Sequence, residues 1–479
     1  MVTTSIPWQA AGPGTRGYAM ERMSALDAGF FFMEHDNVPM HVGSVGVFEG
    51  PPPTYGDLIR LLVSKLPQVP RYRQRVHTVP LHLGRPAWID DEHFEVLYHV
   101  RHTAVPAPGG GEQLRNLAGR VFAQRLDLAK PLWEMWLVEG LQGGGWALIS
   151  KVHHCMIDGV AGWDLAAALL DVTPEARHPE PSPWVPERPP STAWTVVDGL
   201  RDALAAPLQQ LARVPALARN LPTRQEAFDF ARGLPGTVRR AASPAARSLN
   251  GPSGPHRRWE WTQASLNEVR LVRKAFGGTV NDVVLTAVTR GFRDLLAGRG
   301  ELSDTTVVRS LVPVSVRGEH ERGVLNNRVS AVLVNLPVGE PDPLSRLTRL
   351  RAQMDDLKSS RQAAGAQTLT GLAGFAAPTL LALGTRLTFR FPQPLMQTVT
   401  TNVPGPQFPL YMLGRQMTEI HPYVPIASNI RISVGILSYL GQLNFGINAD
   451  FDTVKDIGVL SKGIRDGVDE LVALAASAA

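Results

Sequence analysis

Two adjacent histidines, His153 and His154, are the side chains of this sequence best suited to acid–base chemistry. They close a short apolar run, residues 146–154, which is typical of a buried strand that ends in a turn. Side chains alternate along a strand, so one histidine can face a cleft while its neighbour faces the protein. A neutral imidazole near pH 7 can take a proton from an alcohol while that alcohol attacks a carbonyl. The pair therefore suggests a general base for such an attack.

The residues after the pair predict a turn that leads into a helix. Gly159 permits a sharp turn, and residues 160–170 are rich in helix formers. Asp158 comes four residues after His154, on the far side of the turn. We therefore expect Asp158 to brace the loop rather than to share the task of His154.

Other interpretations of the histidine pair are open. Adjacent histidines after a strand are more often hydrogen-bonded core residues than catalysts, and they can also bind metal. A metal site is the weaker alternative, because neighbours on a strand diverge, zinc ligands are usually separated, and no further Cys/His cluster lies nearby in the sequence. Cys155, the only cysteine, is interpreted as a small buried hydrophobe. A single cysteine excludes an internal disulfide framework and suits a reducing compartment.

Length and composition predict a globular protein of two domains. The 479 residues exceed one comfortable core, and 44% are hydrophobic while 19% are charged. The formal net charge is +5, without a dense basic stripe, so nothing indicates nucleic-acid binding. This mild positive charge does fit anionic lipid head groups or the phosphates of a nucleotide-bearing substrate. No secretory signal is visible.

Strands and helices are interspersed throughout, which indicates a mixed α/β fold. We divide the chain into a flexible leader (1–19), an N-terminal domain with the histidines (20–180), an interdomain linker (181–258) and a C-terminal domain (259–479). In the C-terminal domain, Thr279 to Asp282 caps a helix. We expect helices at 283–296, 343–361 and 454–474, and strands at 307–314, 329–336, 399–402, 430–437 and 442–450.

Two segments raise the question of membrane contact. The linker combines a proline-rich stretch with amphipathic helical spacing and many arginines, so residues 191–250 are either a connector with a solvated basic face or an interfacial anchor. Residues 362–385 carry no charge, but their Pro, Gly, Gln and Thr make them too mild for a spanning helix. We expect a buried or interfacial helix pair there.

Five segments together resemble the bacterial wax ester synthase/acyl-CoA:diacylglycerol acyltransferases, within the CoA-dependent acyltransferase superfamily. His153 to Gly159 matches the HHxxxDG motif of that superfamily. The other matching segments are 24–27 with 39–43, 131–134, 280–283 and 402–406. The resemblance covers nearly the whole chain. It implies two chloramphenicol-acetyltransferase-like α/β sandwich domains with a central substrate tunnel between them.

The resemblance also implies roles for single residues. His154 matches the family's catalytic base and His153 its inward-facing neighbour. Asp158 matches a structural acid that pairs with a basic residue, which the sequence does not identify. Asn281 lies where the family places a polar group near the reacting carbonyl, as a donor to the developing oxyanion.

Five further residues are candidates for substrate contact: Gly159, Asp282, Thr400, Thr401 and Asn402. Of these, Asp282 is expected mainly to orient the start of its helix, and Thr400 or Thr401 is a less favoured candidate for a further hydroxyl near the site. The segments 131–133 and 402–406 are interpreted as more structural than catalytic.

The activity that the resemblance implies is transfer of a long-chain acyl group from acyl-CoA, as co-substrate, to the hydroxyl of diacylglycerol and also of a long-chain alcohol. This reaction needs no metal, no cofactor and no covalent intermediate. We expect a cytoplasmic enzyme that is peripherally associated with the inner membrane face or with lipid droplets. The alternatives are a superfamily acyltransferase with another hydroxyl acceptor or a carrier-bound acyl donor, and a non-catalytic protein that binds neutral lipid.

Overall fold

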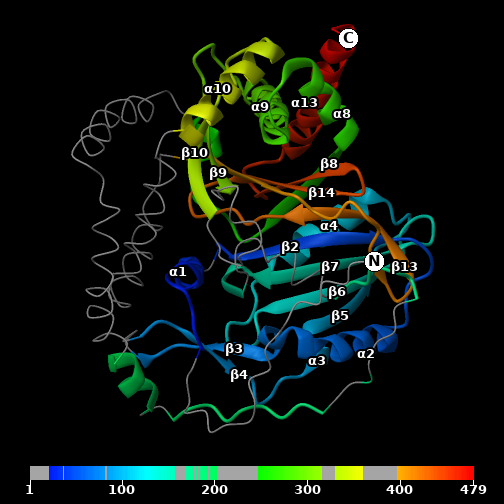
Figure 1. The fold of residues 1–479 in the computed structure, drawn as a ribbon, viewed down its shortest axis with the longest axis vertical. Helices are drawn as coiled ribbons and strands as arrows, with labels where there is room; N and C mark the ends of the chain where they lie inside the picture. Colours follow the sequence, from blue (N-terminus) through cyan, green and yellow to red (C-terminus); the bar gives the residue numbers. More distant parts are fainter. Residues whose placement is uncertain are drawn as a thin grey trace.

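Two six-stranded mixed sheets form the centre of the molecule, as seen in a computed structural model (Figure 1). The structure describes residues 21–35, 37–80, 84–156, 169–175, 180, 183–191, 194–201, 246–315, 329–359 and 396–478. Among the helices in these ranges, none has the length and hydropathy needed to span a bilayer. The predicted leader, most of the linker, residues 160–168 of the predicted helix and the uncharged stretch 362–385 lie outside the described residues.

The first sheet has the strand order β12-β13-β2-β7-β6-β5. Its strands are β2 (His41–Phe48), β5 (Val100–Ala104), β6 (Trp133–Glu139), β7 (Trp146–His153), β12 (Tyr411–Met412) and β13 (Arg415–Tyr423). Neighbours are antiparallel except for β5 and β6. The predicted strand at 146–154 is thus confirmed as β7, and a 3-10 turn, η4 (His154–Met156), follows it directly.

Short helices and a small sheet surround the first sheet (Figure 1). They are α1 (Ala25–Met33), α2 (Tyr55–Lys65), η1 (Leu66–Gln68), η2 (Pro70–Arg73), α3 (Val96–His99), α4 (Gly111–Ala123) and the strands β1 (Glu21–Arg22), β3 (Gln74–His77) and β4 (Ala87–Asp90). Helix α4 lies between the two sheets, because its Phe122 packs in one cluster with Ile149 of β7 and Trp259 of the second sheet. The helix therefore packs against both sheets and holds them together.

The second sheet has the order β10-β9-β11-β14-β15-β8, and its helices cover one face of it (Figure 1). The strands are β8 (Arg257–Ser265), β9 (Val308–Ser315), β10 (Val329–Leu336), β11 (Thr398–Val403), β14 (Ile432–Tyr439) and β15 (Gln442–Asp450). The helices are α8 (Leu266–Phe276), α9 (Val280–Gly298), α10 (Pro343–Ser359) and α13 (Ile457–Ser477), and a short turn, η5 (Arg247–Leu249), precedes β8. The predicted helices and strands of this half are confirmed, with ends shifted by up to three residues.

Strand β13 belongs to the first sheet although it lies late in the chain. It pairs with β2, with Tyr423 opposite Gly43, and so gives β2 a partner on its second edge. A pair of glycines in the second sheet lets β13 pass close by, since a Cβ at Gly446 would lie 1.7 Å from the carbonyl oxygen of Pro422. The two halves are therefore interlocked. The predicted domain boundaries stay predictions, but Tyr411–Tyr423 complete the first sheet.

Candidate active site

The histidine pair is fixed at the end of β7 by backbone bonds on both sides. The N–H of His153 donates to the carbonyl of Leu132 at 2.9 Å, and the N–H of His154 donates to the carbonyl of Met40 at 2.8 Å. Leu132 and Met40 lie in two of the other segments that carry the family resemblance. Those segments thus hold the strand end from which both imidazoles project.

The imidazole of His153 faces the protein interior and is fully buried. Its Nδ1 accepts a hydrogen bond from the N–H of Cys155 at 3.1 Å, and its Nε2 lies 3.3 Å from Oε2 of Glu34. A ring nitrogen that accepts carries no proton, so the proton resides on Nε2. The ring of His153 is therefore oriented with Nδ1 towards the Cys155 N–H and Nε2 towards a carboxylate.

Glu34 is a site residue that the sequence did not reveal. It caps the C-terminus of α1, and its side chain is 0% exposed. Burial acts to raise its pKa, but the contacts with His153, the Met40 N–H and Arg125 outweigh burial and lower the pKa to about 2. The only sequence signal was an acid at the end of the apolar run Phe30 to Met33.

The imidazole of His154 stacks on Phe30 of α1, with ring centroids 3.9 Å apart and an interplanar angle of 25°. Its Nδ1 is buried and has no hydrogen-bond partner among the described residues, whereas part of the residue stays accessible. Burial lowers the pKa of His154 to about 4. The ring is therefore neutral at pH 7, the form that a general base needs.

A buried ion pair lies on the face of β7 that carries His153. Nζ of Lys151 is 3.1 Å from Oε2 of Glu134 and donates to the carbonyls of Val121 and Gln124 at 3.2 and 2.9 Å. Those carbonyls lie at the C-terminal end of α4, where a cation is favoured by the helix dipole. The pair thus fixes α4 against the strand that ends in the histidines.

Asn281 and Asn402 meet on the second sheet. Asn281 lies in the first turn of α9, and Nδ2 of Asn402 on β11 donates to its Oδ1 at 3.4 Å. The neighbouring Asp282 is buried, and its Oδ2 accepts from the N–H and the hydroxyl of Thr279 at 2.7 and 2.8 Å. Asp282 therefore caps α9, as its position in the sequence predicted.

The other residues predicted to contact substrate do not lie together in the structure. Thr400 is buried and its hydroxyl accepts from Ser310 at 2.9 Å, whereas Thr401 points to the opposite face of β11. Asp158 and Gly159 lie outside the described residues. The structure thus brings His153 next to His154, and Asn281 next to Asn402. Within the part of the chain that the structure describes, no hydrogen bond or ion pair joins the two groups, and no cluster of His, Cys, Asp or Glu is arranged to hold a metal ion.

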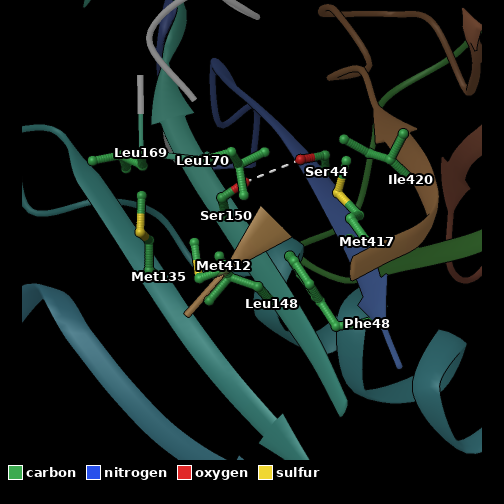
Figure 2. Close-up of a pocket in the computed structure, with 11 residues that line it drawn as sticks. Ser44, Phe48, Met135, Leu148, Ser150, Leu169, Leu170, Met412, Met417 and Ile420 are labelled. Atoms are coloured by element: carbon green, nitrogen blue, oxygen red, sulfur yellow. Dashed lines mark hydrogen bonds between the residues drawn. The ribbon is translucent and has the colours of Figure 1, made fainter. Parts of the chain in front are cut away.

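A small cavity lies on the face of the first sheet that is opposite to His153. Figure 2 shows Ser44 and Ser150, hydrogen-bonded at 3.0 Å, among apolar side chains that include Met135 and Met417. Its volume is about 30 Å³, which gives room for water but not for an alkyl chain.

A larger groove of about 850 Å³ runs where α4 meets β8. Its basic side chains are Arg115, Arg120, His256, Arg257 and Arg258, against the acids Glu112 and Glu260. Arg115 pairs with Glu260 at 2.8 Å. Arg257 donates to the carbonyl of Asn37, in the turn that follows Glu34. The groove is therefore basic and reaches the turn next to the histidine pair.

Solved structures share this architecture. A wax ester synthase/diacylglycerol acyltransferase from Marinobacter aquaeolei VT8 superposes with a TM-score of 0.65 at 25% identity, over 95% of this chain and 100% of that one. A trichothecene 15-O-acetyltransferase from Fusarium sporotrichioides superposes with a TM-score of 0.58 at 12% identity, over 94% of each chain. The fold is therefore that of the chloramphenicol-acetyltransferase-like acyltransferases, with two α/β sandwich domains.

Sequence comparison gives the family. The wax ester synthase/diacylglycerol acyltransferase catalytic domain matches residues 23–284, and the C-terminal domain of the same family matches residues 325–472. A probable diacylglycerol O-acyltransferase of Mycobacterium tuberculosis is 37% identical over 462 residues, which are 95% of this chain and 96% of that protein. The chain belongs to the wax ester synthase/diacylglycerol acyltransferase family and is an acyltransferase. The resemblance noted in the sequence is confirmed, and the matched catalytic domain contains both the histidine pair and Asn281.

Proposed function

We propose that the enzyme transfers a long-chain acyl group from acyl-CoA to the hydroxyl of diacylglycerol, and also to that of a long-chain alcohol, with His154 as the general base. The observation that carries the proposal is the enclosed, neutral imidazole of His154 at the end of β7. The names of the Mycobacterium tuberculosis and Marinobacter relatives support diacylglycerol as an acceptor, and the latter also supports an alcohol.

In this mechanism His154 takes the proton of the acceptor hydroxyl as its oxygen attacks the thioester carbonyl. Collapse of the tetrahedral intermediate breaks the carbon–sulfur bond and expels CoA thiolate, to which the imidazolium returns the proton. Oδ1 of Asn281 accepts from Asn402, so the NH2 group of Asn281 remains available as a donor to the oxyanion. A thioester is already activated, so modest base catalysis and proximity of the two substrates in a tunnel suffice.

The basic groove between α4 and β8 suits the phosphates of the donor. Arg120 is exposed and Arg258 donates to a backbone carbonyl of Phe451, so neither charge has a carboxylate partner among the described ion pairs. We place the nucleotide part of acyl-CoA along this groove, with the thioester directed to the histidine pair.

The acceptor is insoluble in water, which supports a site of action at the cytoplasmic face of the inner membrane or on lipid droplets. The net charge of +5 favours contact with an anionic surface. Flotation with vesicles that contain anionic lipid and diacylglycerol tests this part: the protein should float with these vesicles and stay at the bottom with neutral phosphatidylcholine vesicles.

An acceptor panel tests the reaction itself. Purified protein is given radiolabelled palmitoyl-CoA with diacylglycerol or with hexadecanol, and neutral lipid and free CoA are measured. We expect triacylglycerol with the first acceptor and wax ester with the second. If neither forms while a carrier-loaded acyl donor reacts, the enzyme is a different acyltransferase of the superfamily. If no donor reacts and neutral lipid binds, the protein has a lipid-binding role.

A further inference from the structure

A buried carboxylate lies behind the histidine pair and has no task in the reaction steps given above. Glu34 contacts three groups at once. Its Oε2 accepts from the Met40 N–H at 2.9 Å and lies 3.3 Å from Nε2 of His153, and its Oε1 accepts two bonds from Arg125 at 3.2 Å each. A carboxylate that is out of water needs such partners, because isolated burial of its charge is costly.

The contact with His153 fixes one ring. Nδ1 of His153 is used by the N–H of Cys155, so the N–H on Nε2 is the group that faces Glu34. Both side chains are 0% exposed, so no water competes for this contact. The Cys155 N–H sets the tautomer of His153, and the carboxylate lies against the Nε2 edge of the same ring.

The contact with Met40 reaches His154 by a second route. The N–H of Met40 is bonded to Glu34, and the carbonyl of the same residue accepts from the N–H of His154 at 2.8 Å. Glu34 also ends helix α1, whose Phe30 stacks on the His154 ring. The side chain of one acid thus supports the neighbouring ring, the backbone and the stacking partner of the candidate base.

We propose that Glu34 is a positioning residue that acts through His153 and Met40 to aim the imidazole of His154 at the acceptor hydroxyl. This inference rests on the proposed function of His154. Misplacement of a reacting group by about 1 Å costs on the order of 100-fold in rate, whereas a substrate-binding site outside the misplaced group is unaffected. Loss of Glu34 should therefore lower kcat and leave KM for acyl-CoA unchanged.

The chain offers a matched control for this carboxylate–histidine pair. Oε1 of Glu139 lies 2.9 Å from Nε2 of His102 on the same sheet, but their side chains are 36% and 43% exposed. Both acids belong to the first sheet or border it, and both face an imidazole. Only Glu34 contacts the histidine pair, so Glu139→Ala should leave kcat and KM as in the wild type.

The experiment compares wild type, Glu34→Ala, Glu34→Gln and Glu139→Ala in steady-state assays with palmitoyl-CoA and diacylglycerol. We expect kcat of Glu34→Ala to fall roughly 10- to 100-fold at constant KM. Gln keeps an oxygen acceptor for the Met40 N–H but lacks the charge that pairs with Arg125, so its kcat should fall about 3- to 10-fold. Thermal unfolding shows which variants are folded. If Glu34→Ala does not fold, the kcat of Glu34→Gln is the test. An unchanged kcat in the folded variant overturns the proposal.

A double mutant separates positioning from general destabilisation. In a His153→Ala background, Glu34→Ala should lower kcat by a smaller factor than in the wild type, because only the route through Met40 then remains. Equal losses of kcat in both backgrounds, or a rise of KM in place of a fall of kcat, overturn the proposal. A wild type without activity on any donor would instead overturn the proposed function, which keeps the two failures distinct.

Discussion

The two sheets hold their candidate site residues by different means. At the end of β7 the surroundings are charged and closed, with Glu34 and Arg125 behind His153 and an aromatic ring over His154. Where α9 meets β11 the contact between the site residues is an uncharged amide–amide bond between Asn281 and Asn402. The first arrangement sets a protonation state, and the second can only orient a dipole. In the proposed mechanism the first sheet accordingly supplies the group that transfers the proton, and the second supplies the donor that stabilises charge.

Removal of the base should have the largest effect. His154→Ala should lower kcat by about 100- to 10,000-fold, because a positioned general base contributes that much. His102→Ala, an imidazole on the exposed part of the same sheet, serves as the control and should leave kcat unchanged. Undiminished synthesis of neutral lipid by His154→Ala would show that the first sheet does not supply the base. A lipid-binding role would then remain for the site.

The next test concerns the second sheet. Asn281→Ala should lower kcat by about 100-fold, as loss of one oxyanion donor does, without moving the pH dependence of the rate. Asn402→Ala should have a smaller effect, since Asn402 only orients the amide of Asn281. A shift of the pH profile in Asn281→Ala would show that the second sheet also controls protonation, against the comparison above.

Acid unfolding sharpens the comparison from the side of stability. The pKa of Glu34 is depressed from 4.5 to about 2, so its ionised form stabilises the fold above pH 4.5 and this contribution is lost as the pH falls towards 2. The wild type should therefore lose on the order of 2 to 3 kcal/mol more than Glu34→Gln between pH 4.5 and 2. Urea unfolding of both proteins at several pH values measures this difference. Parallel curves would contradict it.

The rate should depend on pH in the way that a depressed pKa dictates. The base must be unprotonated, and burial lowers the pKa of His154 to about 4. We therefore expect kcat/KM to be constant from neutral pH down to about 5 and to fall about tenfold for each further unit below pH 4. A fall that begins near pH 6.5 would mean that the ring is solvated during turnover.

The smallest expected effect is that of a substitution in the basic groove between α4 and β8. Arg120→Glu should raise KM for acyl-CoA about 3- to 10-fold at unchanged kcat, because it replaces an exposed positive charge in the groove by a negative one. Arg270→Glu, an exposed arginine on α8 that is not among the groove residues, provides the matched control. Equal effects of both substitutions would indicate a general dependence on net charge.

Much of this fold could be predicted because its signals are local. The short apolar run and the turn after it predicted β7, and Thr279 with Asp282 predicted the start of α9. The family followed from the order of five short segments. The placement of β13 in the first sheet could not be predicted, because strand pairing between residues far apart in the chain leaves no local pattern.

The site was predicted in part for the same reason. His153 and His154 are adjacent in sequence, so their pairing was evident, whereas Glu34 meets His153 only through the packing of α1 on the end of β7. A single acid after an apolar helix is usually a solvated cap. The residue type and the position of Glu34 therefore did not predict that its side chain is buried. Asp158 and Gly159 stay predictions, as do the substrate contacts of Thr400 and Thr401.

The late arrival of β13 has a consequence for biosynthesis. During translation β2 can pair early with β7, but its second edge stays open until residues 415–423 have left the ribosome. A nascent chain with an unpaired strand edge is prone to join other chains. The enzyme should therefore depend on chaperones while it is being made, and fragments that stop before residue 411 should aggregate when expressed alone.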